Sequence, residues 1–346
     1  MLLRELNRGQ CKTYLLGCER DRVAALIDPV RDHIDRYLAM LAYLKLELQV
    51  VIDTHTHADH RTACFLLGDL TGAAVLMHRN APAPRVDRHL EDGDTLALGG
   101  LTLKFLATPG HTPDGVSIVV GDCVFTGDTL LIRGTGRADF AGGDPGAQYD
   151  SIVGKLFTLP DDTKVLPAHD YRGNTASTIG EERRLNPRVA GQSRDAYVAV
   201  MASLQLPLPG RIQEVLQPNQ SALEDDALHY PSLAQLNEVR QLTPAALDQM
   251  LAHDPAPMVI DVREESEFRG ALGHIPGAKL IPLRTLADRA AELGSGKEAQ
   301  IVVVCRSGVR SSTAAAILTS LGFEDVSNLK GGMLAWNDAK LPVQVT

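Results

Sequence analysis

The feature of this sequence that most limits its fold is a set of histidines and aspartates that recur directly after short apolar runs. The run VVID leads into THTHADH, and later apolar runs lead into PGHT, TGDTLL and PAHDY. Loops that follow the strands of one layered domain gather at one end of its sheets, so we expect these side chains to converge. Imidazole and carboxylate groups in such a cluster bind zinc, iron or manganese. The set comprises His55, His57, Asp59, His60, His111, Asp128 and His169.

Each of these histidines, taken alone, is more often a capping or core residue than a ligand. Seven candidates at these spacings, in a chain with eleven histidines, favour a metal site instead.

The first half of the chain has the pattern of a layered α/β domain. Short β-type runs cover residues 13–16, 24–27, 48–52, 74–77, 101–107, 116–120 and 124–126. Apolar residues at helical spacing cover 32–46, and 149–158 has a similar pattern. Strands and helices mixed in this order predict sheets covered by helices.

The pattern changes over residues 204–230, which hold prolines, polar residues and an acidic cluster without a sustained period. We interpret this stretch as the connection between two domains, which a length of 346 residues also favours. The predicted boundaries are an N-terminal domain at 1–218, a linker at 219–238 and a C-terminal domain at 239–346. In the last of these, Thr243 and Pro244 predict a helix start, MVIDV and IVVVC predict buried parallel strands, and SSTAAAILTSLGF predicts a helix.

A second chemical signal is the segment CRSGVRSS, which follows the apolar run IVVV. A thiolate at the end of a buried strand, facing backbone N–H groups and a helix N-terminus, lies in a site that stabilises anions. Arg306 and Arg310 add positive charge beside Cys305. The usual fate of a free cysteine is inert burial, which we expect for Cys64 and Cys123, whose neighbours carry no such charge.

Composition limits the class of protein and its partners. The formal charge of −9 does not suggest a basic surface for nucleic acid or for a membrane, and no apolar run reaches the ~18–20 residues of a membrane span. Five cysteines without a CxxC pair indicate neither a disulfide framework nor a thiolate zinc site, and they favour a reducing compartment. The first ten residues lack the apolar core of a signal peptide, so we expect a cytoplasmic protein. A homo-oligomer is compatible with these features.

The pattern H-x-H-x-D-H with separate later His, Asp and His positions resembles the metallo-β-lactamase superfamily over about residues 1–215. The resemblance implies an αβ/βα sandwich with metal between the sheets. Two branches compete. Glyoxalase II-like thioester hydrolases use all seven positions to hold two metals, whereas persulfide dioxygenases bind one Fe(II) through two histidines and one aspartate. The segments LLIRGTGRADF and LPAHDYRGNTASTIGEERRLNPR resemble the dioxygenase branch, and AHDY stands where glyoxalase II usually shows Gly-His-Glu-Tyr.

The dioxygenase resemblance implies a role for each position. One Fe(II) per chain would bind His55, His111 and Asp128, in an arrangement that leaves open positions for a substrate sulfur and O2. His57, Asp59, His60 and His169 would orient these ligands. Glutathione contacts are implied at Arg137, Tyr171 and Arg188, of which Arg188 is equally well an exposed loop arginine. The reaction implied is oxidation of glutathione persulfide by O2 to sulfite and glutathione. Because all seven groups are present, a second metal stays open.

The C-terminal part resembles the rhodanese family over about residues 241–341, through DVREESEFRGALGHIPGA, CRSGVRSS and KGGMLAW. The resemblance implies an α/β domain with a parallel sheet, in which Cys305 takes the outer sulfur of thiosulfate, releases sulfite and passes the sulfur to glutathione. The loop is C-x4-R, shorter than the C-x5-R loop of related phosphatases, which favours sulfur over phosphoryl transfer. Arg263 either contacts this loop or donor, or forms a structural ion pair with a nearby Glu.

Together the two halves resemble fusions of a persulfide dioxygenase with a rhodanese domain. The alternatives are a two-metal thioester hydrolase in the first half and a non-catalytic rhodanese binding module in the second.

Overall fold

The computed structural model describes residues 1–7, 11–139, 142–174, 176–204, 212–221, 231, 233–294 and 296–345. The chain divides into two compact units, residues 1–34 with 46–225 and residues 35–45 with 226–346. In the part of the chain that is described, no helix has the length and apolar character needed to cross a membrane.

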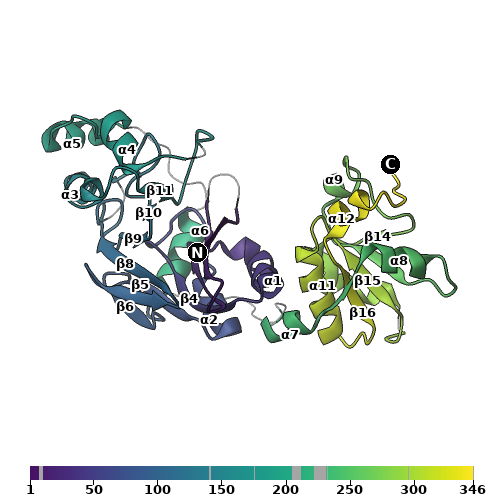
Figure 1. Cartoon of the computed structure of the whole chain (residues 1–346). Helices are drawn as coiled ribbons and strands as arrows, with labels where there is room; N and C mark the ends of the chain where they lie inside the picture. The colour runs from purple at the N-terminus through teal and green to yellow at the C-terminus, as the bar shows by residue number, and fades with distance from the viewer. Residues whose placement is uncertain are drawn as a thin grey trace. The chain divides into compact units, whose positions relative to one another are not determined.

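The first unit contains two sheets that face each other (Figure 1). The first sheet has the order β1-β2-β3-β4-β5-β6, with β1 (Leu2–Glu5), β2 (Tyr14–Cys18), β3 (Val23–Ile27), β4 (Glu47–Ile52), β5 (Ala74–His78) and β6 (Arg88–Leu90). The second sheet has the order β11-β10-β9-β8-β7, with β7 (Thr95–Leu98), β8 (Leu101–Ala107), β9 (Val116–Val120), β10 (Cys123–Gly127) and β11 (Lys164–Pro167).

The core of this unit lies between the sheets, and strand alternation explains it. Val50 and Ile52 of β4 and Phe125 of β10 join one apolar cluster, because side chains at every second position share a face. Val124, which precedes Phe125 on β10, points to the opposite face of the sheet. It joins a second apolar cluster with residues of α3 (Pro145–Gly154), α4 (Ile179–Leu185) and α5 (Arg194–Ser203). On the first sheet, α2 (Cys64–Thr71) packs against β4 and β5. The predicted αβ/βα sandwich is confirmed.

The seven predicted strands of the first half are present with ends shifted by at most two residues, while β1, β6, β7 and β11 were not predicted. The predicted helix at 32–46 is a short 3-10 turn (Arg31–His33) followed by α1 (Ile34–Leu44). The helix predicted from residue 149 begins earlier, at Pro145, because the side chain of Asp144 accepts from the N–H groups of Gly146 and Ala147 and caps α3 there; a 3-10 turn follows at Leu156–Thr158.

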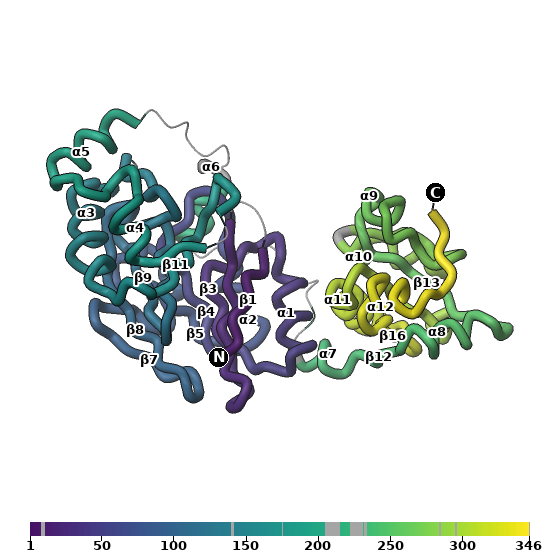
Figure 2. Tube along the Cα trace, turned by 45° about the horizontal axis from the view of Figure 1, so that its top comes forward, coloured from purple at the N-terminus to yellow at the C-terminus, as the bar shows by residue number. Residues whose placement is uncertain are grey.

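The second unit, whose Cα trace is the green-to-yellow part of Figure 2, is built on a parallel sheet with the order β12-β16-β15-β13-β14. Its strands are β12 (Arg240–Leu242), β13 (Met258–Asp261), β14 (Lys279–Leu280), β15 (Ile301–Val304) and β16 (Val326–Leu329). Apolar clusters cover both faces, as a parallel sheet requires. α10 (Leu283–Arg289), the 3-10 turn Ala290–Leu293 and α11 (Val309–Ser320) pack on one face, and α8 (Pro244–Leu251) and α12 (Gly332–Asp338) pack on the other. Two short helices, α7 (Leu233–Glu238) and α9 (Glu265–Phe268), also belong to this unit, as does the segment 35–45, which holds all but the first residue of α1.

Two local predictions for this half are tested by the structure. Thr243 caps α8, since its side chain accepts from the N–H of Ala246, and Pro244 stands at the first helical position. The parallel strands are also confirmed. In contrast, the prediction of irregular chain over 204–230 is wrong at Ile212–Ser221, which form helix α6. The predicted domain boundary at 218/219 falls inside that helix and stays a prediction.

Candidate metal centre and cysteine loop

The structure brings the predicted histidines and aspartates together at the strand ends of the first unit. The loop that begins with His55 follows β4, His111 lies between β8 and β9, and Asp128 directly follows β10. His169 lies just beyond β11. Of the whole set, all are buried except Asp59, which is partly exposed.

Three members form a tight set of metal-ligating groups. One ligand atom from each of His55, His111 and Asp128 lies within 4.8 Å of the other two. The Nδ1 atom of His55 lies 3.0 Å from the hydroxyl of Thr54, and the Nδ1 atom of His111 lies 2.6 Å from the carbonyl oxygen of Arg137. Since each ring is held through Nδ1, its Nε2 atom is left for a metal ion.

The charges of this set suit metal binding. Burial, together with the charge of His57, lowers the pKa of His55 well below its usual value, which keeps the ring in the neutral form that binds metals. Burial opposes the charge of Asp128, but the charge of His169 and its hydrogen bond of 2.6 Å hold the pKa of that carboxyl below its usual range. A neutral imidazole from His55 and the carboxylate of Asp128 are therefore available beside the ring of His111.

Gly127 allows the two sheets to approach at this point. It has a φ of +49°, and a Cβ atom there would lie 2.6 Å from the hydroxyl and 3.0 Å from the Cβ of Thr54. Only glycine fits this approach without displacement of its neighbours. The close approach places Asp128, at the end of β10, beside His55, which follows β4.

The ring of His57 is oriented by two buried carboxylates, those of Asp28 and Asp53. Its Nε2 atom lies 3.3 Å from Asp28 Oδ1 and 3.6 Å from Asp53 Oδ1. Burial alone would lower the pKa of His57, but these carboxylates raise it well above its usual value. Asp28 also accepts from the backbone N–H of Thr54, at 2.7 Å, so one carboxylate orients the strand end and the ring together.

Unpartnered ring nitrogens test whether the residues fit a metal. Among the described residues, the buried Nδ1 atom of His57 and the buried Nε2 atom of His60 have no hydrogen-bond partner. Leaving such atoms unpaired costs about 1–3 kcal/mol each, so a buried ring nitrogen without a partner is unusual. Ring nitrogens of this kind are donor atoms for metals, and the neighbouring set of His55, His111 and Asp128 has the donor atoms that a metal ion needs.

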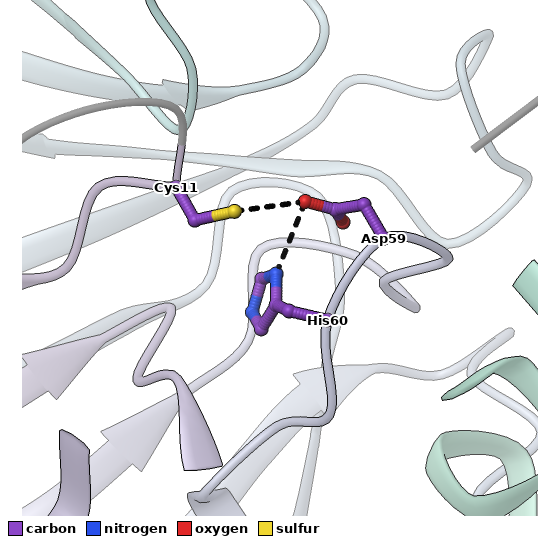
Figure 3. Close-up of side chains that lie close together, drawn as sticks. All are labelled: Cys11, Asp59 and His60. Atoms are coloured by element: carbon purple, nitrogen blue, oxygen red, sulfur yellow. Dashed lines mark hydrogen bonds and ion pairs between the residues drawn. The ribbon is translucent and has the colours of Figure 1, made fainter. Parts of the chain in front are cut away.

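His169 connects the inner set to the rest of the cluster. Its Nδ1 atom lies 2.6 Å from Asp128 Oδ1 and its Nε2 atom lies 2.9 Å from Asp59 Oδ2. The same oxygen of Asp59 lies 3.3 Å from His60 Nδ1 and accepts from the thiol of Cys11 at 3.0 Å (Figure 3). His169, Asp59, His60 and Cys11 thus form a continuous hydrogen-bonded network that is joined to Asp128 through His169.

Cys11 was not predicted as a site residue, because no motif surrounds it in the sequence. An isolated β-bridge between Cys11 and His169 brings it to the cluster. Burial opposes its ionisation, but the imidazoles of His169 and His60 lower the pKa of its thiol. Cys64 and Cys123 match the inert reading: burial raises the pKa of Cys64 well above its usual value and that of Cys123 to about 11.

The three predicted glutathione contacts differ in their surroundings. The exposed ring of Tyr171 stacks on His169 with centroids 5.4 Å apart. The side chain of Arg137 forms an ion pair with Asp139 at 2.6 Å. Arg188 is partly buried and donates to the carbonyl oxygen of Thr135 at 2.5 Å, so it supports a loop and is not the solvated arginine of the alternative prediction.

In the second unit, Cys305 directly follows β15 and is buried. Its sulfur accepts from the backbone N–H of Gly308 and from the hydroxyl of Ser311, both at 3.2 Å. Arg306 is exposed beside the loop. Arg310 instead forms two 2.7 Å hydrogen bonds with Glu267. The loop therefore presents donors to the sulfur, as the sequence predicted, with one arginine exposed and one already paired.

The backbone of this loop is fixed by the start of α12. The N–H groups of Met333 and Leu334 donate to the carbonyl oxygens of Cys305 and Arg306 at 2.8 and 3.0 Å. The first N–H groups of a helix have no partner within the helix, so the loop carbonyls satisfy them. This contact explains why KGGMLAW accompanies the cysteine loop in the sequence.

Of the two roles predicted for Arg263, the structure shows the structural ion pair, with an aspartate as its partner. Its buried guanidinium forms hydrogen bonds of 2.7–3.0 Å with Asp261, and it donates to the carbonyl oxygen of Gly273 at 2.7 Å. The carboxylate in this ion pair is that of Asp261, at the end of β13, and not that of a Glu as in the alternative prediction.

Comparisons with known proteins agree with this geometry. The metallo-beta-lactamase superfamily model matches residues 6–169, and the rhodanese-like domain model matches residues 243–339. The human protein named persulfide dioxygenase ETHE1, mitochondrial, is 43% identical over 209 residues, which is 60% of this chain and 82% of the human protein. The crystal structure of ETHE1 from Myxococcus xanthus matches with a TM-score of 0.63 and 46% identity, over 64% of this chain and 99% of that one.

A metallo-beta-lactamase structure from Staphylococcus aureus matches 95% of this chain and 98% of its own, with a TM-score of 0.60 and 21% identity, which shows the fold alone. The identity to the human and Myxococcus xanthus proteins is higher and covers most of their length. The chain therefore belongs to the metallo-β-lactamase superfamily, as a homologue of the persulfide dioxygenases that carries a C-terminal rhodanese-like domain.

Proposed function

We propose that the chain is a bifunctional enzyme of sulfur metabolism. Its first activity is the Fe(II)-dependent oxidation of glutathione persulfide by O2 and water to sulfite and glutathione. Its second is sulfur transfer between thiosulfate and glutathione through a persulfide on Cys305. The observation that carries the first activity is the set His55, His111 and Asp128, two imidazoles and one carboxylate with converging ligand atoms.

This ligand set fits Fe(II), which prefers two histidines and one carboxylate in oxygenases. Bound there, Fe(II) would supply the redox chemistry that brings O2 and the persulfide sulfur into reaction. The protein's own groups position the site. His169 holds a proton between the carboxylates of Asp128 and Asp59, and the exposed ring of Tyr171 lies over His169 at the surface. The name of the human relative, persulfide dioxygenase, supports the same substrate class.

The overall reaction balances without a further reductant. One glutathione persulfide, one O2 and one water give one glutathione and one sulfurous acid, whose protons leave as sulfite forms. The outer sulfur of the persulfide gains three oxygen atoms, two from O2 and one from water.

The second activity follows from the surroundings of Cys305. The thiolate attacks the outer sulfur of thiosulfate, the S–S bond of the donor breaks, and sulfite leaves with the bonding electron pair. Hydrogen bonds from Gly308 and Ser311 stabilise the thiolate before attack and after release. A glutathione thiolate then takes the outer sulfur of the Cys305 persulfide, which frees Cys305 and forms the substrate of the first activity.

Paired substitutions in the full chain test this proposal. His111→Ala is expected to abolish oxygen uptake with glutathione persulfide and to leave sulfur transfer intact, and Cys305→Ser is expected to do the reverse. Loss of both activities in either folded variant would contradict two independent sites. Two zinc ions per chain with thioester turnover in the absence of O2 would instead indicate the hydrolase, and sulfur transfer unchanged in Cys305→Ser would indicate a binding module.

A further inference from the structure

Helix α6 places the buried side-chain amide of Asn219 against the loop that carries His57 and His60. Its described inner face includes Val215 and Asn219, which lie one helical turn apart and are 0% and 5% exposed. A side-chain amide is costly to bury unless its hydrogen bonds are made. The contacts of Asn219 therefore indicate what the helix is placed to hold.

All of these contacts go to the loop that carries the histidines. The Nδ2 atom of Asn219 donates to the carbonyl oxygens of His57 and His60, at 2.9 and 2.8 Å, and its Oδ1 atom accepts from the N–H of Thr62 at 3.0 Å. His57 and His60 lie outside helices and strands, so their carbonyls have no partner in a regular ladder. One side chain thus uses both of its donors and its acceptor on this loop.

Through Thr62, the hydrogen bonds of Asn219 also connect to the ring of His57. The hydroxyl of Thr62 donates to Asp53 Oδ1 at 3.0 Å, and that oxygen lies 3.6 Å from Nε2 of His57. His57 and His60 are also the two residues whose other ring nitrogens are buried without a partner among the described residues. Asn219 therefore holds the backbone of His57, whose ring centroid lies 4.2 Å from that of His55, and of His60, whose ring centroid lies 4.3 Å from that of His57.

We propose that Asn219 is a positioning residue for the metal centre. It fixes the curve of the loop from His55 to Thr62, so that the imidazoles keep their directions before a metal binds. Helix α6 is then part of the metal centre and not of the linker predicted there from sequence. This inference rests on the proposed function only in taking Fe(II) as the metal.

The test uses the full chain with Asn219→Asp, which keeps the shape of the side chain but replaces two donors with an acceptor facing two carbonyl oxygens. Gln220→Ala is the matched control, since Gln220 is the next residue of α6 and is exposed. Fe(II) affinity is measured without O2 by competition with a chelator. It is expected to fall at least about tenfold in Asn219→Asp, the usual effect of losing a group that orients metal ligands. Gln220→Ala is expected to match the unaltered chain.

A second readout separates positioning from general stability. The electron paramagnetic resonance spectrum of the Fe(II)–nitric oxide adduct reports the arrangement of ligands, and it is expected to change in Asn219→Asp while sulfur transfer at Cys305 stays unchanged. Unaltered Fe(II) affinity and an unaltered spectrum, with or without a lower melting temperature, would overturn the inference.

If Asn219→Asp does not fold, hydrogen exchange in the unaltered chain decides. Fe(II) is expected to slow exchange both in the loop at 55–62 and at the Thr62 amide that donates to Asn219; protection confined to the other ligand loops would overturn the inference. Failure of oxygen uptake with normal Fe(II) binding would reject the proposed function alone, because neither readout here uses a persulfide or O2.

Discussion

Gly332→Ala is the substitution whose effect on the cysteine loop follows most directly from the structure. Gly332 begins α12 with a φ of +57°, and a Cβ atom there would lie 2.3 Å from the carbonyl oxygen of Cys305 and 2.7 Å from the carbonyl carbon of Arg306. Both are backbone atoms, so no flexible side chain can move aside. The loop and the start of α12 must separate, which breaks the hydrogen bonds that orient the loop.

The expected loss of folding free energy in Gly332→Ala has two parts. A left-handed conformation costs a non-glycine residue roughly 1–2 kcal/mol. Forcing an added carbon into a packed contact costs about 1–3 kcal/mol more. Gly277→Ala isolates the first part, since Gly277 has a φ of +80° but no atom within 4 Å of the added Cβ. We expect Gly332→Ala to be less stable than Gly277→Ala by about 1–3 kcal/mol.

The assay uses the single tryptophan of the chain, Trp336, which lies in α12 and is buried. Its fluorescence during urea unfolding reports the second unit, and linear extrapolation gives the free energy of unfolding. Sulfur transfer is measured in parallel and is expected to be lost in Gly332→Ala and kept in Gly277→Ala. Equal stability and equal sulfur transfer in the two variants would refute the argument that close backbone approach fixes the loop.

Two further predictions concern single contacts in each unit. The hydrogen bonds from Arg310 lower the pKa of Glu267, so this pair stabilises the fold above the unfolded pKa of about 4.3 and stops doing so as pH falls through the lower folded value. Glu267→Gln should therefore destabilise the second unit at pH 7 but little at acid pH, and a pH-independent difference in urea unfolding would contradict this. His169→Ala removes the contacts with Asp128 and Asp59, and Fe(II) affinity by chelator competition should fall about 10–100-fold. Unchanged affinity would show that His169 does not orient the centre.

The strands and the site residues could be predicted from sequence where the pattern is local. β4 and β10 are short apolar runs that end directly before the loop of His55 and before Asp128, so periodicity places them within two residues. β6 was missed because its three residues, Arg88–Leu90, include two exposed polar side chains. Pairing with β5 makes it a strand, and pairing is not visible in a single run.

The contacts that were missed join residues far apart in the chain. Cys11 reaches Asp59 from 48 residues away, and Asn219 reaches His57 from 162 residues away. α6 lacks a strong sequence signal because it contains Pro218 and is largely polar. The side-chain amide of Asn219 forms hydrogen bonds with backbone groups of a distant loop, and nothing in the local sequence indicates which backbone groups those are.

The ion pairs of the second unit show a similar limit. The sequence near Arg263 contains several acidic residues, and charge alone does not select among them. The structure pairs Arg263 with Asp261, the last residue of β13, and pairs Arg310 of α11 with Glu267 of α9, a choice that depends on how these elements pack.

The central claim is that the metal centre oxidises a persulfide, and oxygen consumption tests it most directly. Iron-loaded full chain is given glutathione persulfide, and oxygen uptake is recorded while sulfite is counted. The account predicts uptake with an equal amount of sulfite formed. Absence of uptake in protein confirmed to hold iron would contradict the account.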